Sequence, residues 1–268
     1  MNITKYPEID LILNDFSTNL LKILKVKIVG IYLTGSLSYG DFILERSDID
    51  LLVVLKAKLG INEIELIRNL HKDIEDNYPS WKERIECSYT PIYMLGEILP
   101  PKEPRPWIGS GVLYPEAPYG NEWIINSYLL QEYGIPIYGK PYKELLNKPI
   151  DILEVQKACV KDIFKEIEPK IGNKEELYDS HIQSYTVLNT CRILYTVFNA
   201  KVGSKVVSAK WVKEVFAPEW SNLIIKSEKW KYGEDLNSIE EVVEFIKFSI
   251  SKIKETEIFN ISKHETSS

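Results

Sequence analysis

The chain reads IYLTGS at residues 31–36 and SDIDLL at residues 47–52, and these two stretches decide what the surrounding sequence is expected to form. The first is rich in β-branched and aromatic residues and ends at Gly35, which is typical of a buried strand that enters a turn. The second places Asp48 and Asp50 at the beginning of another apolar strand. Because side chains at i and i+2 leave the same face of a strand, the two carboxylates are expected to project together.

The paired acids and the preceding Gly-Ser step suit a site for a metal ion and a triphosphate. Two neighbouring carboxylates repel each other, and a divalent cation keeps both ionised; oxygen ligands favour Mg²⁺, which retains positions for water and phosphate oxygens. Gly35 lets the backbone approach a ligand closely, and the Ser36 hydroxyl and nearby amides offer donors to phosphate. Ser47 offers a further hydroxyl beside Asp48. The joint pattern indicates phosphoryl or nucleotidyl transfer.

Alternating helical and strand patterns surround these stretches in the first half of the chain. Hydrophobic spacing predicts, in order, a helix over 8–25, strands over 26–33 and 48–56, a helix over 61–78 and a strand over 85–95. A proline-rich segment then extends to residue 121, and we expect it to form a long loop, of a kind that is often functional.

The second half of the chain is helical in pattern, apart from a short strand expected over 135–138. Apolar residues recur at three- and four-residue spacing in five segments, which are 122–133, 152–170, 181–200, 205–216 and 237–256. The composition changes near residue 150. We therefore predict an α+β fold, with a mixed sheet and helices in residues 1–150 and an all-helical domain in residues 151–268. The polar end, 262–268, is expected to fray.

The composition limits the classes of protein to which the chain can belong. A hydrophobic fraction of 44% supports a core and excludes a disordered chain. The 33 basic and 39 acidic residues argue against a protein that coats nucleic acid. Cys87, Cys159 and Cys191 are too widely spaced for a metal or disulfide framework. Because the sequence shows neither a signal peptide nor a long apolar run, we expect a cytoplasmic protein that does not bind membranes. We also expect a monomer that does not bind nucleic acid.

The two opening stretches resemble the signature of the polymerase-β-like nucleotidyltransferase superfamily. The resemblance implies a small mixed sheet with helices, two Mg²⁺ ions, and transfer of a nucleoside monophosphate from a triphosphate with loss of pyrophosphate. It also implies a third carboxylate on a neighbouring strand, for which Glu86 is the candidate, either as a metal ligand or as the general base for the acceptor hydroxyl. Glu83, just outside the expected strand, is the competing acid.

Residues 187–195 and 205–211 resemble the C-terminal domain of the streptomycin/spectinomycin adenylyltransferases. In that family the substrates sit between the two domains. Arg192 lies in an apolar helix and needs an anionic partner, which could be a triphosphate or a carboxylate of another helix. The resemblance implies that Lys205 reaches the phosphates and that Tyr232 packs near the nucleotide.

The expected reaction is Mg²⁺-dependent transfer of AMP from ATP to a hydroxyl of a small cationic acceptor of the aminoglycoside type. Candidates for contacts with the acceptor are Trp107 and Trp123. His181 could be a base or a substrate contact, but a lone histidine at the start of a helix is more often a plain surface residue. Two alternatives stay open: the same chemistry on another metabolite or on a protein hydroxyl, and an inactive nucleotide-binding module.

Overall fold

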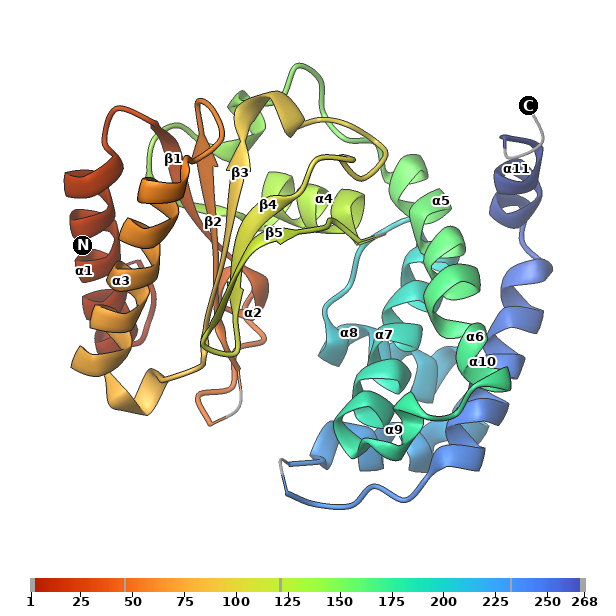
Figure 1. The fold of residues 1–268 in the computed structure, drawn as a ribbon. Coiled ribbons are helices and arrows are strands. Elements are labelled where there is room, and N and C mark those ends of the chain that lie inside the picture. The colour runs from red at the N-terminus through yellow and green to blue at the C-terminus, as the bar shows by residue number, and fades with distance from the viewer. Residues whose placement is uncertain (1–2, 46, 121, 232, 266–268) are drawn as a thin grey trace. The chain divides into compact units, whose positions relative to one another are not determined.

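The computed structural model describes residues 3–45, 47–120, 122–231 and 233–265. The chain divides into two compact units, Met1–Ile150 and Asp151–Ser268. Figure 1 colours the first unit from red to green and the second from green to blue. The units differ in class, because the sheet belongs to the first and the second is helical, so the predicted α+β fold is confirmed.

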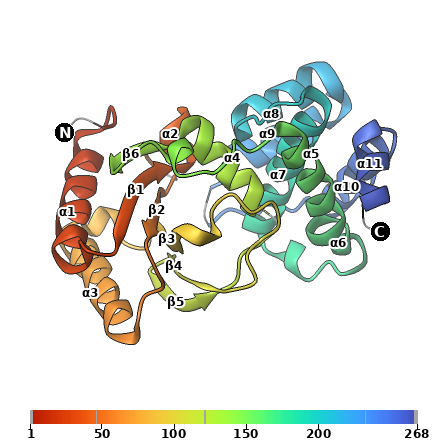
Figure 2. The ribbon, with the colours of Figure 1, turned by 90° about the horizontal axis from the view of Figure 1, so that it is seen from above.

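A mixed sheet forms the centre of the first unit. Among the described residues it has six strands in the order β5-β4-β3-β2-β1-β6, with only β2 and β3 parallel. The strands are β1 (Ile28–Thr34), β2 (Ile49–Leu55), β3 (Ile85–Pro91), β4 (Arg105–Gly109), β5 (Val112–Ala117) and β6 (Ile135–Tyr138). Figure 2 shows this sheet from above. Because β2 and β3 are parallel, both begin at the same edge of the sheet.

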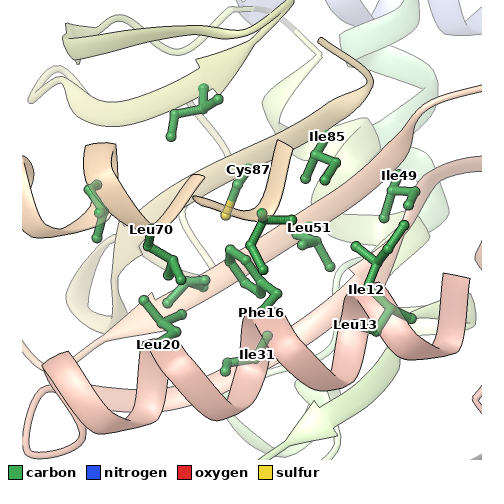
Figure 3. Close-up of a cluster of buried hydrophobic side chains, with 14 of the residues drawn as sticks. Ile12, Leu13, Phe16, Leu20, Ile31, Ile49, Leu51, Leu70, Ile85 and Cys87 are labelled. Carbon is green, nitrogen blue, oxygen red and sulfur yellow. The ribbon is translucent and has the colours of Figure 1, made fainter. Parts of the chain in front are cut away.

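Two helices, α1 (Pro7–Leu24) and α3 (Ile61–Asn77), pack together and cover one face of the sheet. Figure 3 shows their apolar side chains meeting those of the strands, among them Phe16, Leu70, Leu51 and Cys87. Leu51 and Cys87 directly follow Asp50 and Glu86 in their strands. Because successive side chains point to opposite faces, the two acids project from the face that α1 and α3 do not cover. The core thus anchors the strands, while on the opposite face Asp50 and Glu86 are half-buried near the starts of β2 and β3 and the later Leu52 and Val54 are buried.

The proline-rich segment is not a loop, which corrects the prediction made for it. It contains strands β4 and β5, joined by a tight turn in which Ser110 (φ 51°) and Gly111 (φ 72°) both have the positive φ that such a hairpin requires. Pro106 lies where the pairing register of β4 shifts, and Pro115 lies on β5, the edge strand. Prolines are tolerated at those two kinds of position, so their number did not prevent a hairpin.

The second unit is built around helix α7 (Ser180–Asn199), which contacts four other helices and buries most of its length. Those neighbours are α5 (Ile152–Asp162), α8 (Lys205–Trp211), α9 (Ser221–Lys229) and α10 (Ile239–Lys254). Further α-helices are α2 (Gly35–Tyr39) and α4 (Trp123–Tyr133) in the first unit and α6 (Pro169–Gly172) and α11 (Glu257–Glu265) in the second. No helix within the described residues combines the length and apolarity that a bilayer crossing demands.

Several expected boundaries were wrong. The strand expected to reach residue 95 ends at Pro91, because the chain turns into a short 3-10 helix at Ile92–Met94. Helix α9 was not predicted. The end expected to fray is helical as far as Glu265.

Candidate active site

Gly35, the first residue of α2 directly after β1, lies against the carboxylate of Asp50. Gly35 has φ +64°, and a Cβ atom built on it would lie 1.8 Å from the Asp50 Oδ2 atom. Thr34 and Asp50 are paired across the antiparallel strands β1 and β2, which explains the contact. Helix α2 follows, with Ser36 half-buried in its first turn. The Gly-Ser step and the second acid of the motif therefore lie together, as their chemistry requires.

Glu86 joins this arrangement through the sheet register. It is the Cα partner of Asp50 across the parallel strands β2 and β3, and paired positions project from the same face. Both side chains are half-buried. Glu83 instead precedes β3 in a left-handed conformation (φ 64°), is exposed, and lies against Gly111 of the hairpin turn. The register thus favours Glu86 over Glu83 as the third acid.

Asp48 and Ser47 lie in the segment that enters β2. The Asp48 side chain is 43% exposed, and its Oδ1 atom is 3.9 Å from Nε of Arg84. The Ser47 hydroxyl accepts a hydrogen bond from the Ile43 amide (3.0 Å), and the Ser47 amide donates to the Ile43 carbonyl (2.8 Å). Ser47 therefore closes a local turn, in which its hydroxyl is an acceptor and keeps its own donor.

The chemistry of the three acids fits a hard divalent cation. Within the described part of the chain, no group of three or more His, Cys, Asp or Glu side chains is preassembled as a metal cage. Magnesium does not need one, since it is held by one or two carboxylates together with water and substrate phosphates. Asp50, aimed at the Gly-Ser turn, and Asp48, exposed beside it, provide oxygen ligands of that kind.

A groove of about 540 Å³ opens along β4 and β5. Trp107 and Tyr114 are paired across these strands and stack with ring centroids 5.5 Å apart, while Glu116 and Glu122 supply negative charge. Trp107 is also the partner of Ser88, two residues beyond Glu86 on β3, so the aromatic pair lies on the sheet face that carries Glu86. Flat aromatic faces with nearby carboxylates are suited to a cationic ligand.

Arg105 gives this groove a rigid end. Its guanidinium donates to Ser88 Oγ (3.1 Å) and to the carbonyls of Ala117 and Pro118, and it lies 4.2 Å from the centre of the Tyr119 ring. Burial raises the pKa of Tyr119 to about 12, so its hydroxyl stays protonated and donates to Thr90. These contacts tie the end of β5 to β3.

The two tryptophans predicted as acceptor contacts have different surroundings. Trp107 is partly exposed and lines the groove. Trp123 is 7% exposed, donates its indole proton to the Glu97 carbonyl (2.8 Å) and packs edge-on against Tyr119. Trp123 is therefore a packing residue.

In the second unit, Arg192 and Lys205 lie at the junction of α7 and α8. Arg192 is half-buried and donates from Nε to the Gly203 carbonyl (3.3 Å). It forms no ion pair with any carboxylate among the residues described. Lys205 begins α8, and its ammonium lies 5.1 Å from the centre of the Tyr185 ring. Tyr232 lies outside the described residues.

His181 lies at the first turn of α7. The side chain of Asp179 caps this helix by accepting from the His181 amide (2.7 Å). The imidazole ring is half-buried, with its centre 5.6 Å from that of Trp230. His181 is thus part of an aromatic cluster rather than a bare surface residue.

Sequence reasoning missed Arg84, Arg105 and Tyr114. The spacing of Arg84, two residues before Glu86, was one available signal, because side chains at i and i+2 of an extended segment project from the same face. The Ser110-Gly111 pair between aromatic segments was the other, since it is typical of a hairpin turn.

Comparison with known proteins gives two family matches and matches to ten chains of solved structures, one of which is described here. Residues 15–86 match the family model described as a nucleotidyltransferase domain, and residues 154–253 match the C-terminal domain of aminoglycoside adenylyltransferase. The crystal structure of spectinomycin adenyltransferase AAD(9) from Enterococcus faecialis with ATP and spectinomycin is 22% identical. The alignment covers 91% of this chain and 98% of that one, with a TM-score of 0.70. None of the curated proteins matches the sequence significantly.

Proposed function

Because the chain belongs to the aminoglycoside adenylyltransferase family and is a nucleotidyltransferase, we propose that it transfers AMP from ATP to a hydroxyl of a small cationic acceptor, with release of pyrophosphate. One observation carries this proposal. Asp50 lies against Gly35 and is paired with Glu86 near the starts of β2 and β3. A close-approach turn beside paired carboxylates is what an enzyme acting on the α-phosphorus of a nucleotide needs.

Each residue of the site has a distinct part in the proposed reaction. Asp48 and Asp50 hold Mg²⁺, which when bound neutralises phosphate charge and orients ATP for in-line attack. The Gly35 backbone, Ser36 and Ser47 bind the triphosphate. Glu86 accepts the proton of the acceptor hydroxyl as general base, so that the oxygen attacks the α-phosphorus as pyrophosphate leaves.

Residues of the helical unit complete the proposed binding of ATP. Arg192 presents a planar fork that suits phosphate, and its hydrogen bond to a carbonyl leaves its charge without a carboxylate partner among the described residues. Lys205 adds a second positive charge at the same helix junction. Tyr232 is proposed to pack near the nucleotide.

The acceptor is proposed to be of the aminoglycoside type. The structural neighbour is described as a spectinomycin adenyltransferase, so spectinomycin is the first compound to test. The groove beside Glu86 supports a small cationic molecule, because it combines two stacked aromatic rings with the carboxylates of Glu116 and Glu122.

The proposal is tested by supplying α-labelled ATP and Mg²⁺ with spectinomycin, streptomycin and other aminoglycosides, and measuring labelled product and pyrophosphate. Asp50→Asn is expected to lower kcat by about a hundredfold or more, since it removes a ligand worth several kcal/mol in the transition state. Asp73→Asn, an exposed acid of α3, is the matched control and should be as active as wild type.

Two results would contradict the proposal. If no aminoglycoside is labelled while another metabolite or a protein is, the acceptor class is wrong. If Asp50→Asn retains wild-type activity with an unchanged melting temperature, the assignment of the metal site is wrong.

A further inference from the structure

Arg84 holds the segment that carries Asp48 by two main-chain carbonyls. It lies immediately before β3, and its Nη2 atom donates to the carbonyls of Leu44 (2.7 Å) and Ser47 (2.5 Å). The segment between α2 and β2 has no regular structure of its own in its described residues. The residues just before Asp48 are therefore held by this guanidinium together with the turn that Ile43 and Ser47 close.

The main chain of Arg84 is tied to the same place. Its carbonyl accepts a hydrogen bond from the amide of Ile49, the residue between Asp48 and Asp50 (2.8 Å). Arg84 thus contacts the aspartate motif from both its backbone and its side chain, and Glu86 follows two residues later on β3. Arg84 is therefore bonded to the segment that carries Asp48 and Asp50 and is close in sequence to Glu86.

Aromatic packing fixes the guanidinium in turn. It lies 4.5 Å from the centre of the Trp81 ring, and Trp81 is only 2% exposed. The other partner of Trp81 is Phe42, from the segment that Arg84 holds, with ring centroids 6.2 Å apart and an angle of 22° between planes. A planar cation that stacks on a buried ring and hydrogen-bonds at its edge has little freedom to move.

The charge of Arg84 lies close to Asp48 without covering it. The Nε to Oδ1 distance of 3.9 Å is longer than a hydrogen bond, and the Asp48 side chain remains 43% exposed. At this distance the cation offsets part of the repulsion between neighbouring carboxylates.

We propose that Arg84 is a positioning residue for the divalent-cation site. By donating hydrogen bonds to the carbonyls of Leu44 and Ser47, Arg84 keeps Asp48 beside Asp50. This inference rests on the proposed function, because it requires that the two aspartates bind Mg²⁺ with ATP. Partners that orient metal ligands typically change metal affinity by about 10- to 100-fold when they are removed. Lysine cannot replace the clamp fully, since an ammonium lacks the planar fork that stacks and hydrogen-bonds at once.

The test compares Arg84→Met and Arg84→Lys with wild type in Mg²⁺ titrations at constant concentration of a non-hydrolysable ATP analogue. The readout is the Mg²⁺ concentration that gives half of the metal-dependent rise in melting temperature. We expect this concentration to increase about tenfold or more in Arg84→Met and less in Arg84→Lys. Activity at saturating Mg²⁺ should recover to near the wild-type kcat in Arg84→Lys.

Arg68→Met is the matched control, because Arg68 forms an exposed pair with Glu65 on α3, and its half-saturating Mg²⁺ concentration should equal that of wild type. The proposal is overturned if both Arg84 variants keep the wild-type Mg²⁺ dependence, even if their melting temperatures fall, since Arg84 would then only stabilise the fold. A wild-type protein with no Mg²⁺-dependent rise would overturn the proposed metal site itself.

Discussion

Gly35 meets two requirements that no other residue meets at its position. Its φ of +64° is costly for a side chain, and the Asp50 carboxylate occupies the space that a Cβ would need. The first requirement was visible in the sequence as a strand ending in Gly-Ser. The second was not, because it depends on how β1 and β2 pair.

His71 is a buried histidine that makes the stability of the first unit dependent on pH. It lies in α3 with 5% exposure, its Nε2 atom is 2.9 Å from the Tyr89 hydroxyl, and burial lowers its pKa to about 3. An unfolded histidine titrates near 6.5. Below that pH the unfolded chain gains a proton that the native chain cannot accept until about pH 3, so stability is present above pH 6.5 and is lost as the pH falls.

We therefore expect the free energy of unfolding to fall more steeply with acidification in wild type than in a His71→Leu/Tyr89→Phe double variant. Urea unfolding at pH 7.5 and pH 5 measures this, and the wild-type protein should lose up to about 2 kcal/mol more over that interval. The double substitution removes both partners, so neither polar group is left buried alone. Equal losses in the two proteins would show that His71 does not control the acid sensitivity.

The β4–β5 hairpin is the element that sequence patterns described least well. Its prolines indicated a loop, but the turn at Ser110 and Gly111 and the shift of register in β4 accommodate a pair of strands. Pairing then sets Trp107 beside Tyr114 on the face that carries Glu86. A flexible loop would not hold two rings in a stacked arrangement, whereas the paired strands fix the two rings side by side along the groove.

If this surface binds the acceptor, Trp107→Leu should raise the KM for the aminoglycoside by about tenfold, the loss expected for a cation–π contact of about 1.4 kcal/mol. The KM for ATP and the melting temperature should change little, because Trp107 is partly exposed. Steady-state kinetics with each substrate varied in turn make the measurement.

Trp123→Leu is the control for that substitution, since Trp123 is buried and bonded to the Glu97 carbonyl. It should lower the melting temperature and leave the KM for the acceptor unchanged. The opposite result, with Trp123 affecting acceptor binding and Trp107 affecting only stability, would exclude the groove as the acceptor site.

The whole molecule combines two units of different class, and the proposed reaction takes residues from both. The acids and the Gly-Ser turn belong to the sheet unit, whereas Arg192 and Lys205 belong to the helical unit. Arg192 was expected to need an anionic partner, and within the described residues it pairs with no carboxylate.

Arg192→Met is accordingly expected to raise the KM for ATP by about tenfold or more, since charge-assisted hydrogen bonds to phosphate contribute about 1.5–3 kcal/mol. Lys205→Met should act in the same direction. Lys210→Met, an exposed lysine on the same helix, should leave the KM unchanged. Initial rates over a range of ATP concentrations distinguish the three variants, and equal KM values in all of them would remove the helical unit from nucleotide binding.

Local patterns alone were enough to predict the α+β class, the strand that precedes Gly35 and the paired acids, because these features depend on periodicity and on residues close in sequence. The family and the candidate third acid, Glu86, came from the resemblance of the motifs to known signatures. The partnership of Asp50 with Glu86, the clamp by Arg84 and the stacking of Trp107 on Tyr114 could not be read in this way. They join residues on different strands, and the packing of the core sets the register that brings those residues together.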